Sequence, residues 1–161
     1  MRLAVILAAL LLVGCAAIPV THGIPNWQRV QQPGPGEGGL YCGGLPDTNG
    51  WQVIQALGVK RVINLTTTPD PQIPGCLMLQ FPMSNWQQEF GLVGSQIEEA
   101  LRAMDTPGPV FVHCIHGMNR TRTVVALWRM RHQGWTRERA VNEANEFGWG
   151  SSFHALKKAV Q

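Results

Sequence analysis

Charged side chains are scarce in this sequence. Asp, Glu, Lys and Arg together make up 14% of the 161 residues, and the formal net charge is only +3. The chain has no run of Lys or Arg, so neither the amount nor the distribution of charge indicates binding to nucleic acid. Internal repeats are also absent, and the length favours one domain with short appendages over two ordinary domains.

The apolar run at the N-terminus is too short to span a bilayer comfortably. It covers Leu3–Val13, follows the charged residue Arg2 and precedes Gly14 and Cys15. This order of a basic, an apolar and a small-residue region is typical of a signal peptide. The stretch LVGC at 12–15 resembles the lipobox of bacterial lipoproteins, which implies cleavage before Cys15 and lipidation of that residue.

We therefore expect residues 1–14 to be a signal peptide and the mature protein to be an exported lipoprotein, anchored in the membrane and facing the periplasm. Ala16 follows the cysteine, and the absence of Asp there favours the outer membrane for lipoproteins of this kind. An ordinary secretory leader, in which Cys15 has no special role, is the alternative. Residues 15–39 include the stretch QQPGPGEGG and no apolar periodicity, so we predict a tether there and a folded domain over 40–161.

Apolar periodicity predicts alternating strands and helices within the folded domain. Short β-branched or apolar runs predict strands at 59–65, 76–81 and 109–113. Residues at helical spacing predict helices at 48–57, 93–104, 120–133, 137–147 and 152–160, with Asp47 or Thr48 and Thr136 as N-caps. Strands separated by helices favour an α/β fold with a parallel or mostly parallel central sheet flanked by helices. Ligands bind at the carboxyl ends of such strands, so the loops after Leu65, Phe81 and His113 should converge.

The nine residues HCIHGMNRT, at 113–121, stand where the last predicted strand turns into a helix. Such a loop points successive backbone N–H groups into one cavity, and a helix N-terminus behind it favours anion binding. The same field stabilises a thiolate, because helix N-termini lower the pKa of a cysteine from about 8.5 to roughly 3.5–7.5. Arg120 adds a planar fork of donors matched to two phosphate oxygens, and Gly117 allows backbone conformations closed to other residues. We interpret Cys114 as a nucleophile directed at a bound oxyanion.

The same stretch matches the protein tyrosine phosphatase signature, His-Cys-x-x-Gly-x-x-Arg-Ser/Thr. The matching residues are His113, Cys114, Gly117, Arg120 and Thr121. Upstream, GLYCGGLPDTNGWQVIQALGVKRVINL is similar to the first part of the domain in bacterial dual-specificity-like phosphatases. The chain therefore resembles this group over residues 40–147.

The resemblance implies a cysteine-dependent phosphatase that hydrolyses phosphate monoesters. Cys114 would form a phosphocysteine intermediate and Arg120 would hold the phosphoryl oxygens, while Thr121 would hydrogen-bond the sulfur. His113 would orient the loop and support the thiolate. The phosphate-binding loop would comprise Ile115, His116, Gly117, Met118, Asn119 and Arg120. The resemblance implies no metal or organic cofactor, and its substrates are phosphorylated proteins or small phosphate esters.

The sequence departs from the family where the general acid is expected. That acid is normally an Asp in the loop after the preceding strand, but FPMSNW at 81–86 contains none, and Asn85 takes the nearest position. Glu89 and Asp70 are the carboxylates that could substitute for it. General acid–base assistance is typically worth about 10²–10⁴ in rate, and a phenolic leaving group needs less of it than an alkyl one. The departure therefore favours aryl phosphates.

Two further features concern charge near the loop. Arg122 stands where the family commonly has Gly, and we expect it either to face solvent or to add positive charge at the pocket rim. The loop has no Lys, which argues against highly charged inositol phosphates as substrates.

Several alternatives stay open at this point. The missing Asp would suit a phosphate-binding module with weak or no catalysis. A sulfurtransferase or an arsenate reductase is disfavoured, because those enzymes place the arginine or the whole motif differently. His113, Cys114 and His116 do not have a common zinc-ligand spacing. Cys42 and Cys76 could pair in an oxidising compartment.

Overall fold

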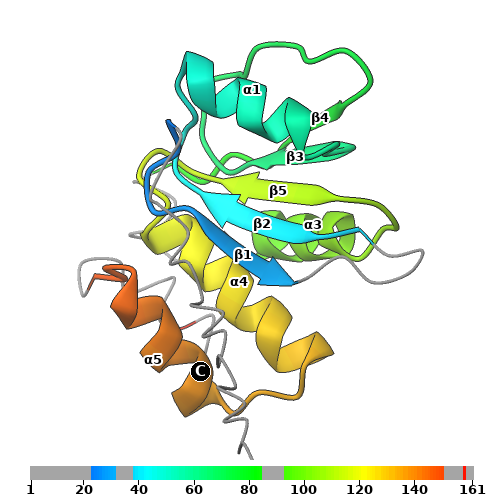
Figure 1. Cartoon of the computed structure of the whole chain (residues 1–161). Helices are drawn as coiled ribbons and strands as arrows, with labels where there is room; N and C mark the ends of the chain where they lie inside the picture. Colours follow the sequence, from blue (N-terminus) through cyan, green and yellow to red (C-terminus); the bar gives the residue numbers. More distant parts are fainter. Residues whose placement is uncertain (1–22, 32–37, 85–92, 151–157, 159–161) are drawn as a thin grey trace, which may run out of the picture.

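Five short strands form the central sheet of the protein. The computed structural model describes residues 23–31, 38–84, 93–150 and 158. The strands are β1 (Gln28–Gln31), β2 (Leu40–Gly43), β3 (Arg61–Asn64), β4 (Leu77–Gln80) and β5 (Val110–His113). Their order across the sheet is β1-β2-β5-β3-β4, and all neighbours are parallel except β1, which is antiparallel to β2 (Figure 1). The predicted α/β fold with a mostly parallel sheet is confirmed.

Helices cover both faces of this sheet. The helices are α1 (Thr48–Ala56), α3 (Gly94–Met104), α4 (Asn119–His132) and α5 (Arg137–Glu146). Helix α1 lies on one face, α3 and α4 lie on the other, and α5 packs against α4 (Figure 1). Within the described residues, none of the helices has the length and apolar character needed to cross a membrane.

The predicted helix starts are confirmed by their caps. The Asp47 carboxylate accepts a hydrogen bond from Gly50 N at 2.9 Å, and the Thr136 hydroxyl accepts one from Arg139 N at 3.3 Å. Both bonds satisfy a backbone donor that the first turn of a helix leaves free. The helix predicted over 152–160 lies outside the described residues, apart from the helical residue Lys158.

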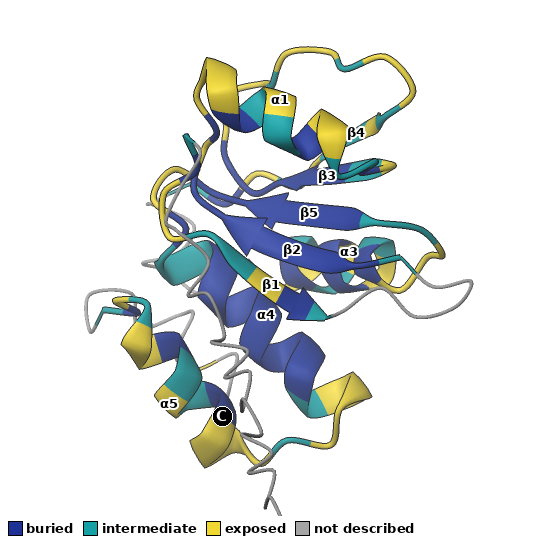
Figure 2. Ribbon diagram, viewed as in Figure 1, coloured by how far each residue is buried: buried dark blue, intermediate teal, exposed yellow. Residues whose placement is uncertain are grey.

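All four residues of β5 are buried (Figure 2). Consecutive side chains of a strand point to opposite faces of the sheet. Val110, Val112 and Cys114 belong to the core beneath α3 and α4. Phe111 belongs to the core beneath α1, and the His113 ring packs against it. The nucleophile candidate and the histidine before it therefore lie on different sides of the sheet.

The tether prediction is wrong for residues 23–31. Ile24 and Val30 are buried, and β1 pairs with β2 from Gln28 opposite Cys42 onward. The strand reads QRVQ, so it has no apolar alternation that a sequence pattern could reveal. It is held instead by its backbone pairing and by polar contacts, including a bond of 3.0 Å from Arg129 to Val30 O. The predicted signal peptide, residues 1–14, and Cys15 lie outside the described residues.

Cys42, Cys76 and Cys114 are free thiols. Cys42 lies on β2 in the core beneath α3 and α4, whereas Cys76 precedes β4 and packs against the other core. Three strand spacings of about 4.8 Å separate β2 from β4, which is far beyond the reach of a disulfide. The suggested pairing of Cys42 with Cys76 is therefore wrong. Burial raises the pKa of the Cys42 thiol to about 11, so this thiol is uncharged at neutral pH.

Candidate active site

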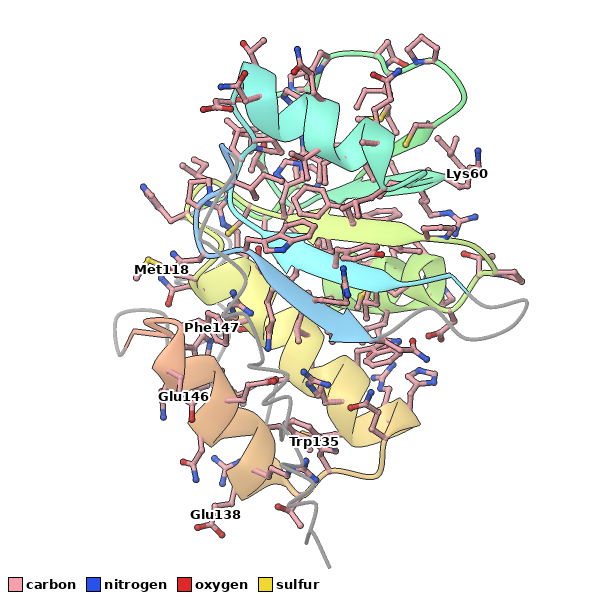
Figure 3. The ribbon with its side chains drawn as sticks, viewed as in Figure 1. Lys60, Met118, Trp135, Glu138, Glu146 and Phe147 are labelled. Carbon is pink, nitrogen blue, oxygen red and sulfur yellow. The ribbon has the colours of Figure 1, made fainter. Side chains whose placement is uncertain are left out.

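The carboxyl ends of β3, β4 and β5 converge on one site, as the topology predicts. The Arg120 guanidinium links them, because its Nη1 donates to Leu65 O after β3 at 3.3 Å and to Met83 O after β4 at 3.1 Å. Met118, in the loop after β5, lies at this end of the sheet with Phe147 nearby, while Lys60 marks the opposite end (Figure 3). Both carbonyl oxygens accept from the same nitrogen of Arg120, Nη1. Its Nε and Nη2 have no acceptor among the described residues.

Close backbone packing shapes the loop at 114–119. Gly117 has a φ of +71°, a value that favours glycine. A Cβ at this position would also lie 2.5 Å from the backbone of Gly43 and Gly44. A Cβ on Gly44 would in turn lie 2.8 Å from Ile115 O. Gly117 and Gly44 thus let the end of β2 approach the loop, and the sequence pattern did not reveal this role of Gly44.

The loop carbonyl oxygens are hydrogen-bonded by groups outside the loop or by the first turn of α4. The bonds run from Leu45 N to Ile115 O (2.9 Å), from the Asn26 amide to His116 O (2.8 Å), from Arg122 Nε to Gly117 O (3.0 Å) and from Arg122 N to Met118 O (3.0 Å). A peptide unit is planar and trans, so a carbonyl turned outward leaves the next N–H turned inward. The N–H groups of 116–119 therefore face the inside of the loop, where α4 begins. Inward N–H groups at the start of a helix are the arrangement expected for an anion-binding loop.

Arg122 is buried, so the expectation that it faces solvent or the pocket rim is wrong. Its side chain is 1% exposed and lies behind the loop. Besides Gly117 O, it donates to Asn26 O, to the Gln28 side chain and to Cys42 Sγ at 3.2 Å. Its guanidinium also lies 3.6 Å from the ring centre of Phe147. A buried charge is tolerated because every side of the guanidinium has a partner.

Polar contacts connect Arg122 to residues of β1, α4 and α5. Gln28, which accepts from Arg122, donates to Glu143 of α5 at 2.9 Å. Glu143 in turn pairs with Arg129 of α4 at 2.6 Å. A continuous polar chain therefore connects the back of the loop to β1, α4 and α5. Asn26 and Gln28 belong to this support, although they lie in the segment predicted as a tether.

Cys114 and Thr121, at the two ends of the loop, are both buried. Cys114 is 3% exposed. The hydroxyl of Thr121 is buried and donates to Gly43 O at 3.3 Å, so its single proton is not directed at the sulfur. The predicted hydrogen bond from Thr121 to the Cys114 sulfur is therefore not formed in this structure.

Asp70 occupies a buried position behind His113. Its Oδ2 lies 2.8 Å from His113 Nε2, and its side chain is 3% exposed. A carboxylate held in this way cannot protonate a leaving group, so the structure argues against Asp70 as the general acid. Asn85 and Glu89, the other positions considered for that role, lie outside the described residues.

Apolar side chains border the entrance to the loop. Ile115 and Leu45 are 46% and 41% exposed, and the hydrogen bond between their backbones holds them side by side. His116, the residue after Ile115, is also exposed. No group of three or more His, Cys, Asp and Glu side chains among the described residues is arranged to hold a metal ion.

A cysteine within an anion-binding loop, at the carboxyl edge of a mostly parallel sheet, defines a cysteine-based phosphatase. The family model described as the catalytic domain of dual specificity phosphatases matches residues 40–146. The chain belongs to the dual specificity phosphatase family. The alternatives of a non-catalytic binding module, a sulfurtransferase and an arsenate reductase are not favoured.

Known relatives agree with this family. The chain is 31% identical to the dual specificity protein phosphatase TpbA of Pseudomonas aeruginosa, over 92% of this chain and 72% of TpbA. The crystal structure of a TpbA variant in complex with pTyr is similar, with a TM-score of 0.60 and 26% identity over 76% of this chain and 78% of that one. The core catalytic domain of the PP-IP phosphatase SIW14 from S. cerevisiae shares the fold, with a TM-score of 0.67, 18% identity and coverage of 85% and 84%.

The support behind the loop can be tested with Arg122→Met. This change leaves Gly117 O, Asn26 O and Gln28 without their donor, so we expect the free energy of unfolding to fall by roughly 3 kcal/mol. Arg102→Met, on the exposed side of α3, is the matched control and should change it by less than about 0.5 kcal/mol. Urea denaturation measures both. Equal stabilities of the two variants would contradict the role assigned to Arg122.

Proposed function

We propose that this protein hydrolyses aryl phosphate monoesters, phosphotyrosine among them, through a phosphocysteine intermediate on Cys114. The observation that carries the proposal is the outward hydrogen bonding of the loop carbonyls, which turns the N–H groups of 116–119 toward the space above Cys114. Relatedness to TpbA, whose variant was crystallised with pTyr, supports the choice of an aryl phosphate.

In the first step the Cys114 thiolate attacks the phosphorus atom. An S–P bond forms, the bond from phosphorus to the aryl oxygen breaks, and the phenolate leaves and takes up a proton. The equatorial phosphoryl oxygens are held by the loop N–H groups and by Arg120, whose Nε and Nη2 have no acceptor among the described residues and can bind two oxygens side by side. The charge that develops in the transition state is thus held by donors already in place.

In the second step water attacks the phosphorus of phosphocysteine. The S–P bond breaks, inorganic phosphate is released with both protons of the water, and the thiolate is restored. The same donors hold the phosphoryl group, because neither Arg120 nor the loop needs to move. Thr121 assists the departing sulfur if its hydroxyl rotates away from Gly43 O, since a hydroxyl proton rotates freely.

The preference for aryl esters rests on two features of the site. Asp70 is committed to His113, so it does not protonate a leaving group, and phenols need less protonation than aliphatic alcohols. The exposed side chains of Ile115 and Leu45 offer an apolar rim that suits an aromatic ring. The loop also has no Lys to match the added charges of an inositol phosphate.

Turnover of aryl, alkyl and inositol phosphates by the mature domain tests this proposal. We expect aryl phosphates to be hydrolysed about 10²-fold faster than alkyl phosphates, because general acid assistance is worth at least that much to the poorer leaving group. Cys114→Ser should abolish turnover. Cys76→Ser is the matched control, since Cys76 lies near the amino end of β4, away from the loop, and should leave turnover unchanged.

Other outcomes have distinct meanings. Turnover that survives Cys114→Ser removes the proposed mechanism, and binding of vanadate without any turnover supports a binding module instead. Equal rates on alkyl and aryl phosphates would mean that a general acid is present. Glu89→Gln then tests whether Glu89 is that acid, because only the loss of the acid lowers the rate on alkyl phosphates selectively. Asn85→Ala is the comparison, since an amide cannot act as a general acid.

We also propose that the mature protein is a lipoprotein of the outer membrane, facing the periplasm and attached through Cys15. The support is the LVGC stretch at 12–15 after an apolar run of signal-peptide length, followed by Ala16. Mass spectrometry of the protein from a bacterial membrane fraction should show a lipid-dependent mass shift on Cys15, and Cys15→Ala should abolish that shift. An unmodified Cys15 at the mature N-terminus would refute the anchor.

A further inference from the structure

A buried pair of side chains lies directly behind the proposed nucleophile. Asp70 Oδ2 is 2.8 Å from His113 Nε2, the histidine side chain is fully buried, and the aspartate side chain is 3% exposed. The other ring nitrogen, Nδ1, lies 3.3 Å from Cys114 O. His113 therefore bridges the Asp70 carboxylate and the peptide group of Cys114.

The acceptors around the ring determine where its protons lie. A carbonyl oxygen only accepts hydrogen bonds, so the contact with Cys114 O requires a proton on His113 Nδ1. The contact at Nε2 then needs a second proton, held either by the ring or by the carboxyl group. Since Asp70 Oδ1 is buried and has no donor among the described residues, His113 is the partner on which this carboxylate depends.

The surroundings of the ring favour the charged form of His113. Phe111 of β5 stacks on it, with ring centres 5.4 Å apart and planes at 9°, and Trp51 of α1 meets it edge to face at 5.9 Å. The negative face of a benzene ring attracts a cation. Helix α1 contains no ionisable side chain, and Asp70 is the ionisable side chain that contacts the ring among the described residues. An imidazolium paired with the Asp70 carboxylate satisfies all of these contacts.

We propose that Asp70 is a positioning residue that keeps His113 doubly protonated, with its Nδ1–H bound to Cys114 O. In the order Asp70, His113, Cys114, the positive charge is nearer to the sulfur than the negative charge, so the pair stabilises the thiolate. Asp70 acts through His113 and does not touch the substrate. The consequence for turnover rests on the function proposed above, whereas the effect on the thiolate does not.

Asp70→Asn separates charge from shape, because an amide of the same size can still hydrogen-bond His113 Nε2. The test is the rate of Cys114 alkylation by iodoacetamide as a function of pH. All variants also carry Cys76→Ser, so that the half-buried Cys76 does not react. The profile of the Asp70→Asn variant should move to higher pH, and the rate at mildly acidic pH should fall about tenfold. With an aryl phosphate, kcat should fall and KM should change little.

Asp105→Asn is the matched control. Asp105 also pairs with a histidine, His132, at 2.9 Å, but this pair is about 40% exposed. Asp105 directly follows α3, and His132 is the last residue of α4. The control should leave the alkylation profile and kcat unchanged. Comparison of the two Asp→Asn variants therefore isolates the pair behind the loop.

Three results would overturn the proposal. An unchanged alkylation profile in Asp70→Asn would mean that Asp70 is only structural, and a shift to lower pH would mean that its carboxylate opposes the thiolate. If the variant does not fold, the ¹⁵N NMR spectrum of the His113 ring in the unmodified protein decides. Two protonated nitrogens support the proposal, and one refutes it. If the alkylation profile moves as expected but the protein turns over no phosphate ester, the proposed function fails while this inference stands.

Discussion

The hydrogen bonds that hold the loop carbonyls from outside are the constraint on which the site depends. A carbonyl that points outward makes the next N–H point inward. A phosphate-binding loop forms only when several successive peptide units are oriented in this way. Arg122 supplies two of these bonds, one from its side chain and one from its backbone. Asn26 and Leu45 supply the others from the segments that flank β1 and β2. The shape of the loop thus depends on residues that lie outside it.

This construction explains why a charged residue is buried in so small a domain. Arg122 gives up its hydration, which is costly, and regains hydrogen bonds to Gly117, Asn26 and Gln28 together with the face of Phe147. Asp70 and His113 repeat the pattern on the other face of the sheet, where a second buried pair contacts the same loop through Cys114 O. The cysteine therefore sits between two polar supports, one on each side of β5.

The fold and the motif could be predicted from sequence because they depend on local signals. The caps Asp47 and Thr136, the apolar spacing from Val93 to Met104 and the nine-residue motif each lie within a few turns of chain. The supports could not be predicted in the same way. Arg122 meets Asn26 across 96 positions and Asp70 meets His113 across 43, and a single sequence carries no periodicity that reports such contacts. From the sequence, the polar residues of β1 are therefore predicted to be a tether, and Asp70 in the loop after β3 is considered as a general acid. In the structure both segments contact the residues that support the loop.

The central claim is that Cys114 attacks a phosphorus atom held by this loop, and the covalent intermediate tests it most directly. The mature protein can be quenched in acid during turnover of an aryl phosphate, and its cysteine-containing peptides analysed by mass spectrometry. The account predicts one phosphoryl group on the peptide that contains Cys114 and none on the peptides that contain Cys42 and Cys76. A phosphoryl group on another residue, or turnover without phosphorylated Cys114 at any quenching time, would contradict it.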